Sequence, residues 1–432
     1  MSSREHFDKD DGRKSGSLII KVTRADDEYE LGVNMLQHRF ITRLTVTTIA
    51  LVSAGIAQAF ADPAVDEALF KERVAWATKG GDGVLDVAAL TPQEIVRGGN
   101  GRPIVRHALG QSSLSQPAKD AAIALVQPLN TAQLLVWHKG ALQLEYYGDG
   151  FSSTTRSSPA SMMKPIMALA IGTAIQRGKI HSINDPVSRY ITEWVNDPRG
   201  AITIKNILEM SSGLQNAQGF GPTSLGLRHS LGTDIRSVIN EVPLAKPPGS
   251  EFQYNNFTSS LGGMVIERAT GMRYAQWVSR TVWRPLGARD GAVWLDKDGG
   301  FARTFCCMIA TGEDWLRVGL MIKDGGRVGR RQLFDRTWID AMIARSPLNP
   351  NFGYQIWRAS PYAAQRSYGP AIALKVPASE PFVADDMVYF DGAGGQRVYI
   401  SRKLDLVIVR IGKATQNWDD AALPNIIARG LR

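Results

Sequence analysis

The chain has 432 residues, 44% of them hydrophobic, so it can bury a large core and is expected to form one large unit rather than a string of small modules. Lys and Arg number 50 against 41 Asp and Glu, which gives a net charge of +9. The basic residues are scattered and no nucleic-acid motif accompanies them, so the charge indicates a basic solvated surface and no nucleic-acid partner is expected.

The first 61 residues have the features of an export signal and a segment preceding it. After Met35 come basic residues, an apolar run over residues 44–57 and the small-residue site Ala59-Phe60-Ala61. This pattern predicts a signal peptide over residues 35–61 and an exported, periplasmic protein. The run is shorter than the roughly 20 residues of a membrane span, so no stable span is expected, a retained anchor being the alternative. Residues 1–34 are acidic, and we expect translation to begin at Met35, with 1–34 a non-native or unstructured extension.

The next segment leads into the catalytic domain that we expect over residues 131–432. Residues 62–130 form an N-terminal lead-in, and up to about Ser115 they are rich in Gly, Pro and charge, which predicts an irregular wrapping segment. An apolar stretch at Leu134 then meets Lys139-Gly140 and returns through Tyr147, which predicts a β-hairpin.

Ser161-Met162-Met163-Lys164 is the only S-x-x-K in the chain. Pro165 is tolerated in the first turn of a helix, so Ser161 and Lys164 are expected at the start of an apolar, buried helix that ends before Gly178. The helix dipole and burial both disfavour an ammonium there, so Lys164 is a candidate base for a Ser161 nucleophile. The alternative makes Ser161 a helix N-cap and Lys164 a solvated side chain.

Helical patterns dominate residues 180–320, which predicts a mainly helical lobe. Within it Tyr254-Asn255-Asn256, the only Y-x-N in the chain, lies where a loop enters a helix. A Tyr254 hydroxyl beside Lys164 can carry a proton, and the Asn256 amide can hold a substrate carbonyl. The alternative is a tyrosine packed on the sheet and an asparagine that caps the helix.

Cys306 and Cys307 are the only cysteines and are adjacent. Neighbouring residues rarely reach the geometry of an ordinary disulfide, so we expect two small buried apolar side chains rather than a bonded pair. The His and Cys residues show no ligand spacing, so no metal site is expected.

The last part of the chain reads as strands, separated by a Gly-rich segment, Asp391 to Gln396. Strands at both ends with helices between them predict an α/β (α+β) fold in which both termini build one central antiparallel sheet. The Gly-rich segment allows close approach of a ligand to the backbone, so an N–H near Ala393, flanked by Gly392 and Gly394, is expected to form an oxyanion hole with the Ser161 N–H.

The three motifs in this order resemble those of the serine β-lactamase and penicillin-binding protein superfamily, in particular its class C β-lactamase-like branch. The resemblance spans roughly residues 134–412, and Pro248-Gly249 before the tyrosine and Pro285-Leu286-Gly287 after it also fit. It implies a β-lactamase-like fold without a cofactor. It also implies an acyl-enzyme on Ser161, with Lys164 and Tyr254 handling protons and Asn256, Gly392, Ala393 and Gly394 in contact with substrate.

The third motif departs from that pattern, because Phe390-Asp391-Gly392 stands where relatives carry a cationic K-T-G. A β-lactam carboxylate would lose a charge-assisted hydrogen bond, so poor β-lactam turnover is expected. The Gly-rich version is more similar to family VIII carboxylesterases and 6-aminohexanoate-dimer hydrolases, which implies small carboxylic esters or linear amides as substrates.

Three alternatives stay open. A β-lactamase, a DD-peptidase or a D-aminopeptidase acting on cell-wall peptides would use the same serine. A catalytically silent binding protein could share the fold. An α/β-hydrolase would need a G-x-S-x-G, which the chain lacks.

Overall fold

The computed structural model describes residues 17–24, 27–34, 63–108, 110–216, 221, 224–416 and 418–432. It divides the chain into two units, Met1–Asp62 and Pro63–Arg432. In the first, β1 (Ser17–Arg24) and β2 (Asp27–Asn34) pair antiparallel. The predicted signal peptide at 35–61 lies outside the described residues, and the start of translation at Met35 stays a prediction. Among the described residues, no helix is both long and apolar enough to cross a membrane.

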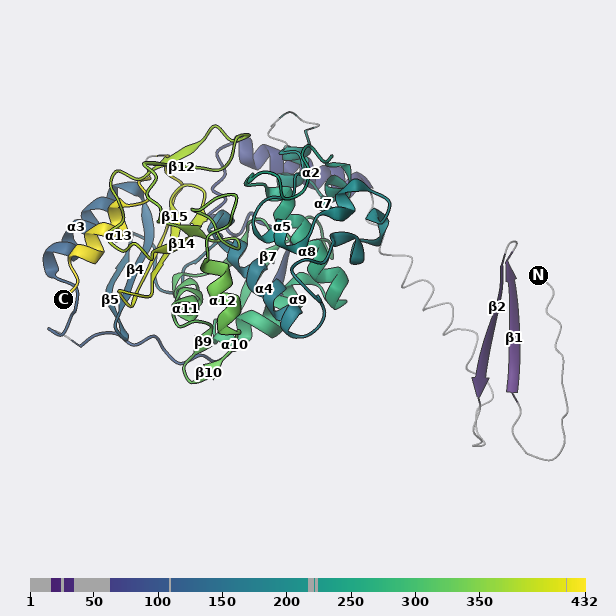
Figure 1. Cartoon of the computed structure of the whole chain (residues 1–432), viewed down its shortest axis with the longest axis horizontal. Helices are drawn as coiled ribbons and strands as arrows, with labels where there is room; N and C mark the ends of the chain where they lie inside the picture. Colours follow the sequence, from purple (N-terminus) through teal and green to yellow (C-terminus); the bar gives the residue numbers. More distant parts are fainter. Residues whose placement is uncertain are drawn as a thin grey trace. The chain divides into compact units, whose positions relative to one another are not determined.

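A six-stranded antiparallel sheet forms the centre of the second unit, as predicted from the strands at its two ends (Figure 1). Its strand order is β11-β14-β15-β16-β4-β5. In that order the strands are β11 (Trp357–Arg358), β14 (Val388–Gly392), β15 (Gln396–Ser401), β16 (Leu406–Gly412), β4 (Thr131–His138) and β5 (Ala141–Tyr147). The predicted hairpin is β4 and β5, and Lys139 and Gly140 make its turn with positive φ angles.

Both faces of this sheet are buried, because alternate side chains along its strands belong to two different hydrophobic cores. Leu134 and Val136 of β4 face one core, to which α3 (Gln116–Val126) and α13 (Ala422–Arg429) contribute. Leu135 of β4 faces the other core, which includes α11 (Gly312–Lys323). The sheet is therefore a middle layer between the α3–α13 pair and the rest of the helices (Figure 1).

The predicted helical lobe is present, but it contains strands that the sequence did not predict. The helix α4 (Lys164–Gln176) precedes it and α12 (Arg336–Ile343) follows it. The helices within it include α5 (Ile204–Leu208), α6 (Leu225–Leu231), α7 (Ile235–Glu241), α8 (Asn256–Thr270), α9 (Tyr274–Val278) and α10 (Arg284–Leu286). A second sheet has the order β3-β7-β8-β6, formed by β3 (Gln93–Val96), β7 (Gly291–Trp294), β8 (Met308–Thr311) and β6 (Arg156–Ser157). Its strands are too short to show an alternating pattern in the sequence.

The expected irregular lead-in is wrong in part, because it begins with the helix α2 (Pro63–Thr78). The buried guanidinium of Arg73 ties this helix to the lobe through hydrogen bonds to the Leu231 and Asp296 carbonyls, and it also donates to the Thr91 carbonyl. Tertiary contacts of this kind leave no periodic signal in the sequence.

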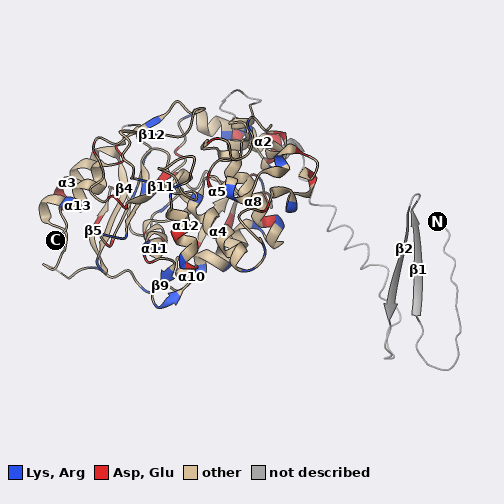
Figure 2. Ribbon diagram, viewed as in Figure 1, with Lys and Arg blue, Asp and Glu red and all other residues tan. Residues whose placement is uncertain are grey.

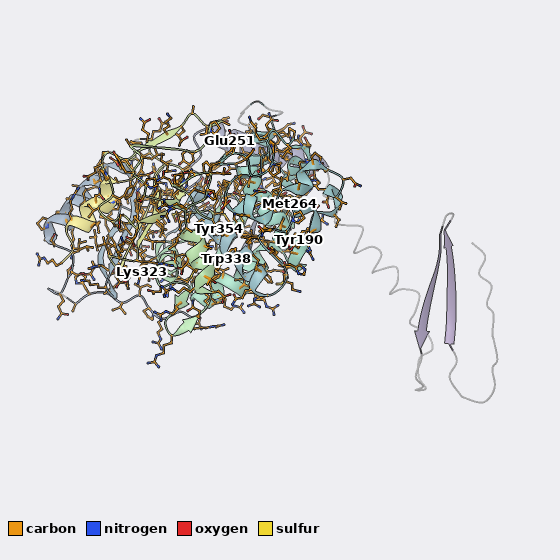
Figure 3. All side chains as sticks on the ribbon, in the orientation of Figure 1. Tyr190, Glu251, Met264, Lys323, Trp338 and Tyr354 are labelled. Carbon is orange, nitrogen blue, oxygen red and sulfur yellow. A yellow bond between two sulfur atoms is a disulfide. The ribbon has the colours of Figure 1, made fainter. Side chains whose placement is uncertain are left out.

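Two further strand pairs lie at the edges: β9 (Arg327–Val328) with β10 (Arg331–Gln332), and β12 (Gln365–Ser367) with β13 (Lys375–Pro377). Buried apolar side chains fill the space between the layers, among them Met264 of α8, which Figure 3 labels. Positions of both charge signs are interspersed along its ribbon (Figure 2).

Candidate active site

Ser161 lies in a tight turn immediately before α4. The turn is a 3-10 segment, Ala160–Met163, and Ala160 enters it with a positive φ of 49°. Pro165 stands in the first turn of α4, as the sequence predicted, and the helix is buried from Lys164 to Ala174. Ser161 lines the cavity described below, whereas Lys164 is buried behind Ser161 and does not line the cavity.

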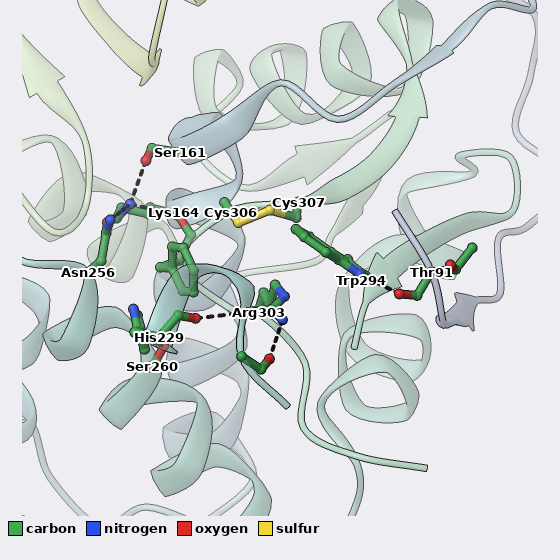
Figure 4. The surroundings of a disulfide bond; sticks show 12 residues. Thr91, Ser161, Lys164, His229, Asn256, Ser260, Trp294, Arg303, Cys306 and Cys307 are labelled. Carbon is green, nitrogen blue, oxygen red and sulfur yellow. Dashed lines mark hydrogen bonds between the residues drawn. A yellow bond between two sulfur atoms is a disulfide. The ribbon is translucent and has the colours of Figure 1, made fainter. Parts of the chain in front are cut away.

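Lys164 is 2% exposed, and its Nζ has three oxygen partners. The Nζ atom lies 2.7 Å from Ser161 Oγ and 2.9 Å from Asn256 Oδ1 (Figure 4). It also lies 2.7 Å from the Phe305 carbonyl oxygen. Burial lowers the pKa of Lys164 to about 7, although the charge of Asp391 acts in the opposite direction. A large fraction of the Lys164 amine is therefore unprotonated near pH 7.

These three contacts fit a neutral amine that faces the hydroxyl. Such an amine has two N–H groups, which can donate to the carbonyl oxygens of Asn256 and Phe305. Its lone pair then points to Ser161 and can accept the hydroxyl proton. The solvated Lys164 of the alternative hypothesis is not observed.

Tyr254 immediately precedes the N-cap of α8 and is 8% exposed. Its ring centroid lies 4.8 Å from Lys164 Nζ, and its backbone N–H donates to the Tyr368 carbonyl at 2.8 Å. Burial raises the pKa of the Tyr254 phenol well above its ordinary value and the charge of Asp391 adds to this, while a hydrogen bond with Ser161 opposes both. The phenol is therefore neutral at physiological pH, so it can donate its proton and then be reprotonated.

The two asparagines after the tyrosine have different roles, one as a helix cap and the other at the cavity. Asn255 is the helix cap, because its Oδ1 accepts the Phe257 N–H at 2.9 Å. Asn256 uses its Oδ1 for Lys164 and lines the cavity, so its amide NH₂ is placed to meet a ligand.

The Gly-rich segment lies beside the serine turn. A Cβ on Gly392 would lie 2.1 Å from the Pro159 carbonyl, so only glycine allows this close approach of β14 to the turn. Among the described residues, none accepts a backbone hydrogen bond from the Ser161 or Ala393 amide. Both residues line the same cavity, together with Gly392 and Gly394, so the two N–H groups are available to an oxyanion.

Asp391 lines the cavity, but its negative charge is neutralised by two buried arginines. Its carboxylate lies 3.0 Å from Arg366 Nη1 and 2.5 Å from Arg397 Nη1, and both guanidinium groups also bind Asp420, each at 2.7 Å. Burial alone would raise the pKa of Asp391, but the charges of Arg366 and Arg397 outweigh it and hold this pKa below its ordinary value. Phe390, the other residue at the K-T-G position, is fully buried in the core.

The site opens into a cavity of about 880 Å³. Its walls include apolar side chains from two segments far apart in the sequence, namely Tyr368, Ile372, Leu374, Val376 and Trp418. Lys375 lies at the rim, is exposed and has no ion-pair partner among the described residues. The described residues contain no group of three or more His, Cys, Asp and Glu that could hold a metal ion.

The expectation for the cysteines is wrong, because Cys306 and Cys307 form a disulfide bond (Figure 4). Their Cα atoms are 3.7 Å apart, closer than in an ordinary bridge. Cys307 adopts a positive φ of 74° at this turn, a conformation that was not predicted.

Sequence reasoning also missed the partners that surround Lys164 and the cavity. Phe305 contributes a backbone carbonyl, which has no sequence signature. His229 of α6 lines the cavity and stacks on Phe305 with ring centroids 4.3 Å apart. The Lys375 rim position had no motif to mark it.

The chain is similar to a family of known proteins and to individual members with assigned names. The chain matches the family model described as Beta-lactamase over residues 122–430. It is 27% identical over 227 residues to the 6-aminohexanoate-dimer hydrolase of Paenarthrobacter ureafaciens, covering 50% of this chain and 57% of that protein. It is 34% identical over 145 residues to esterase EstB of Burkholderia gladioli, covering 30% of this chain and 36% of that protein. The chain thus spans less than two thirds of the length of either relative.

Solved structures share the architecture. A Bacillus anthracis protein provisionally named 6-aminohexanoate-dimer hydrolase matches with a TM-score of 0.64 and 18% identity, over 80% of this chain and 90% of that one. A Bacteroides dorei protein provisionally named β-lactamase matches with a TM-score of 0.58 and 18% identity, over 73% and 98%. At these identities the likeness concerns the fold, and it confirms the β-lactamase-like architecture that the motifs implied.

Proposed function

Because this chain belongs to the β-lactamase family, we propose that it is a serine hydrolase that forms an acyl-enzyme on Ser161 and acts on small carboxylic esters or linear amides. One observation carries the proposal. The buried Lys164 amine lies 2.7 Å from the Ser161 hydroxyl at the edge of a large cavity. A hydroxyl paired with a base in this way is an activated nucleophile.

The proposed reaction starts with Lys164 accepting the Ser161 proton while Ser161 Oγ bonds to the substrate carbonyl carbon. The carbonyl oxygen becomes an oxyanion, which accepts hydrogen bonds from the Ser161 and Ala393 amides. The Tyr254 hydroxyl then donates its proton to the leaving oxygen or nitrogen and is reprotonated from Lys164. A water molecule then attacks the carbonyl carbon of the acyl-enzyme through the same proton transfers. This step releases the carboxylic acid and restores Ser161.

The charges around the cavity support the substrate class. Asp391 and Arg397 neutralise each other, and Phe390 points into the core, so β14 presents no free cation to a substrate carboxylate. The apolar wall suits the chain of an ester or amide. The names of the two curated relatives, a dimer hydrolase and an esterase, agree with this proposal.

A specific observation favours a second candidate, a β-lactamase or a peptidase that acts on cell-wall peptides as a DD-peptidase or D-aminopeptidase. Lys375 is an unpaired cation at the cavity rim and would be the group to meet a substrate carboxylate there. It stands on β13, away from the strand that carries the third motif.

A substrate panel distinguishes the two candidates. Short p-nitrophenyl esters, a linear aminohexanoate amide and the chromogenic cephalosporin nitrocefin are assayed with the wild-type protein and with Ser161→Ala. We expect turnover of an ester or the amide, slow turnover of nitrocefin, and loss of all activity in the variant. Nitrocefin turnover as fast as that of the esters would establish the second candidate, above all if Lys375→Ala abolished it. Ester turnover that survives Ser161→Ala would refute both.

We propose further that the protein is exported to the periplasm, on the strength of the signal pattern at residues 35–61. N-terminal sequencing of the protein purified from its native host checks this. A mature chain that begins at Asp62 is expected, whereas a chain that retains residues 1–34 contradicts it.

A further inference from the structure

The disulfide lies next to one of the three groups that hold the candidate base. Cys306–Cys307, labelled in Figure 4, directly follows Phe305, whose carbonyl accepts a hydrogen bond from Lys164 Nζ at 2.7 Å. No step of the proposed reaction uses the two sulfur atoms, and the sequence offered no reason for them to be bonded.

The segment before the disulfide is held firmly. Arg303 is fully buried and donates to the His229 carbonyl at 2.8 Å and the Gly232 carbonyl at 2.6 Å. Thr304 Oγ1 donates to the Ser259 carbonyl at 2.9 Å. These bonds fix the chain up to Thr304 and anchor it to α6 and α8.

The segment after the disulfide is held as well, because the Trp294 N–H donates to the Cys307 carbonyl at 3.1 Å and β8 begins at Met308. The Phe305 carbonyl lies between these two anchored parts. A bond between adjacent side chains closes a small covalent ring around the peptide that joins Cys306 to Cys307. That ring contains the Cys306 Cα–C bond and the Cys307 N–Cα bond, so it restricts ψ of Cys306 and φ of Cys307. It thereby fixes the course of the chain from the anchored Cys307 back to Phe305, and with it the position of the Phe305 carbonyl.

We propose that the Cys306–Cys307 disulfide is a positioning element that holds the Phe305 carbonyl against Lys164, so that the thiol–disulfide state of this pair controls the rate of acylation. This inference rests on the proposed function of Ser161 and Lys164. It names a role for two residues that the family motifs do not include.

Losing the carbonyl changes the base in two ways. The neutral amine loses one of the two acceptors that aim its lone pair at Ser161, and a small displacement of a reacting group is costly. The ammonium form loses one of its three acceptors, which disfavours it further. The other groups that face Lys164 stay in place: the carboxylate of Asp391, the neutral phenol of Tyr254, and His229, whose pKa burial and the charges of Arg303 and Lys164 hold well below its ordinary value.

Reduction needs only a dithiol. A thiolate of the reductant attacks one sulfur, the S–S bond breaks, and the reductant leaves as its own disulfide, so two electrons and two protons convert the pair into two thiols. Cys306 is partly exposed and Cys307 is buried, which makes the Cys306 sulfur the accessible one.

The test compares oxidised wild-type protein, the same protein after incubation with dithiothreitol, and the variants Cys306→Ser and Cys307→Ser. The kcat/KM for a p-nitrophenyl ester is measured across pH, and mass spectrometry after alkylation counts free thiols. We expect reduction and either substitution to lower the plateau of kcat/KM by about ten- to a hundredfold and to move its acidic limb to lower pH. Dithiothreitol should leave Cys306→Ser unchanged.

Three results would overturn the inference. Native protein in which both cysteines alkylate without prior reduction has no disulfide. If reduction has no effect on kcat/KM, the disulfide has no role in acylation. A lower plateau with an unmoved acidic limb shows that the disulfide merely stabilises the fold. The Ser161→Ala variant separates these failures from a failure of the proposed function, since its ester turnover refutes the function whatever the thiols do.

Discussion

Lys164 is a buried amine without an ion-pair partner among the described residues. Lys323, which is 7% exposed at its side chain, shows the usual arrangement, with the carboxylates of Asp324 and Asp405 both 2.5 Å away. Lys164 has only neutral oxygen partners, and Asp391 acts on it from a distance. A buried charge without a counter-ion is costly, so this site favours the neutral amine that a general base requires.

The pH dependence of kcat/KM follows from this state of Lys164. Its pKa is lowered to about 7 and the base acts when neutral, so kcat/KM falls as the pH drops below about 7 and reaches a plateau above it. A pH–rate profile with a p-nitrophenyl ester measures the limb. Lys164→Arg should remove nearly all activity at every pH, because a guanidinium stays protonated. A wild-type profile that is flat from about pH 5 to about pH 9 contradicts the assignment.

Tyr254→Phe separates proton transfer from packing. The ring contacts with Trp357 and Tyr368 stay, while the hydroxyl that bonds to Ser161 is lost. Acylation should slow by about 10²- to 10⁴-fold, the usual contribution of a proton-transfer group, with an unchanged melting temperature. Single-turnover kinetics and thermal unfolding check both parts. Near-normal acylation at unchanged stability would remove Tyr254 from the reaction.

The motifs predicted which side chains lie together, and the groups outside the motifs were missed. Ser161, Lys164, Tyr254 and Asn256 come together as their motifs indicated. The Phe305 carbonyl and its neighbouring disulfide were not predicted, because a backbone atom carries no residue identity and adjacent cysteines usually stay unbonded.

Between elements, the contact of β14 with the serine turn decides whether an oxyanion site exists. Gly392→Ala would place a Cβ 2.1 Å from the Pro159 carbonyl, so the strand and the turn must separate. We expect kcat to fall by about 10²- to 10³-fold, the loss seen when one oxyanion donor is removed, with a smaller change in KM. Gly83→Ala is the matched control, since its Cβ would meet only Trp76 at 3.9 Å. Equal kcat in both variants would argue against this site.

The four buried charges under the cavity join β12, β14 and β15 to the segment before α13. Asp420→Ala removes a carboxylate that binds both Arg366 and Arg397, which leaves buried guanidinium charge uncompensated. The free energy of unfolding should fall by about 3 to 5 kcal/mol, measured by urea denaturation. Asp385→Ala, which breaks an exposed ion pair with Lys403, should leave the midpoint unchanged. A similar midpoint in both variants would show that the buried charges contribute no net stability.

The elements with strong patterns were predicted and the short ones were not. The strands β4 and β16 and the helix α4 carry long apolar runs and matched the prediction. The shorter strands β14 and β15 were predicted as well. The sheet β3-β7-β8-β6 consists of strands with two to four residues, which is too few to show alternation. The helix α2 has mixed composition and is held by Arg73 through contacts distant in sequence.

Across the molecule, the candidate site is assembled where three parts of the chain meet. Ser161 and Lys164 come from the start of α4, Tyr254 and Asn256 from the entrance to α8, and the Gly-rich segment from the end of β14. The cavity wall adds β13, residues of the loop that precedes it, and Trp418. The order of the motifs predicted this meeting only through the family resemblance, because the spacing of segments this far apart does not fix their contacts.

The central claim is that Ser161 carries the acyl group, and intact-mass spectrometry with a fluorophosphonate probe tests it most directly. We predict one adduct per chain, located by peptide mapping on Ser161, and none on Ser161→Ala, while the nearby Ser153→Ala labels like the wild type. An adduct on another residue, or equal labelling of Ser161→Ala, would contradict the account.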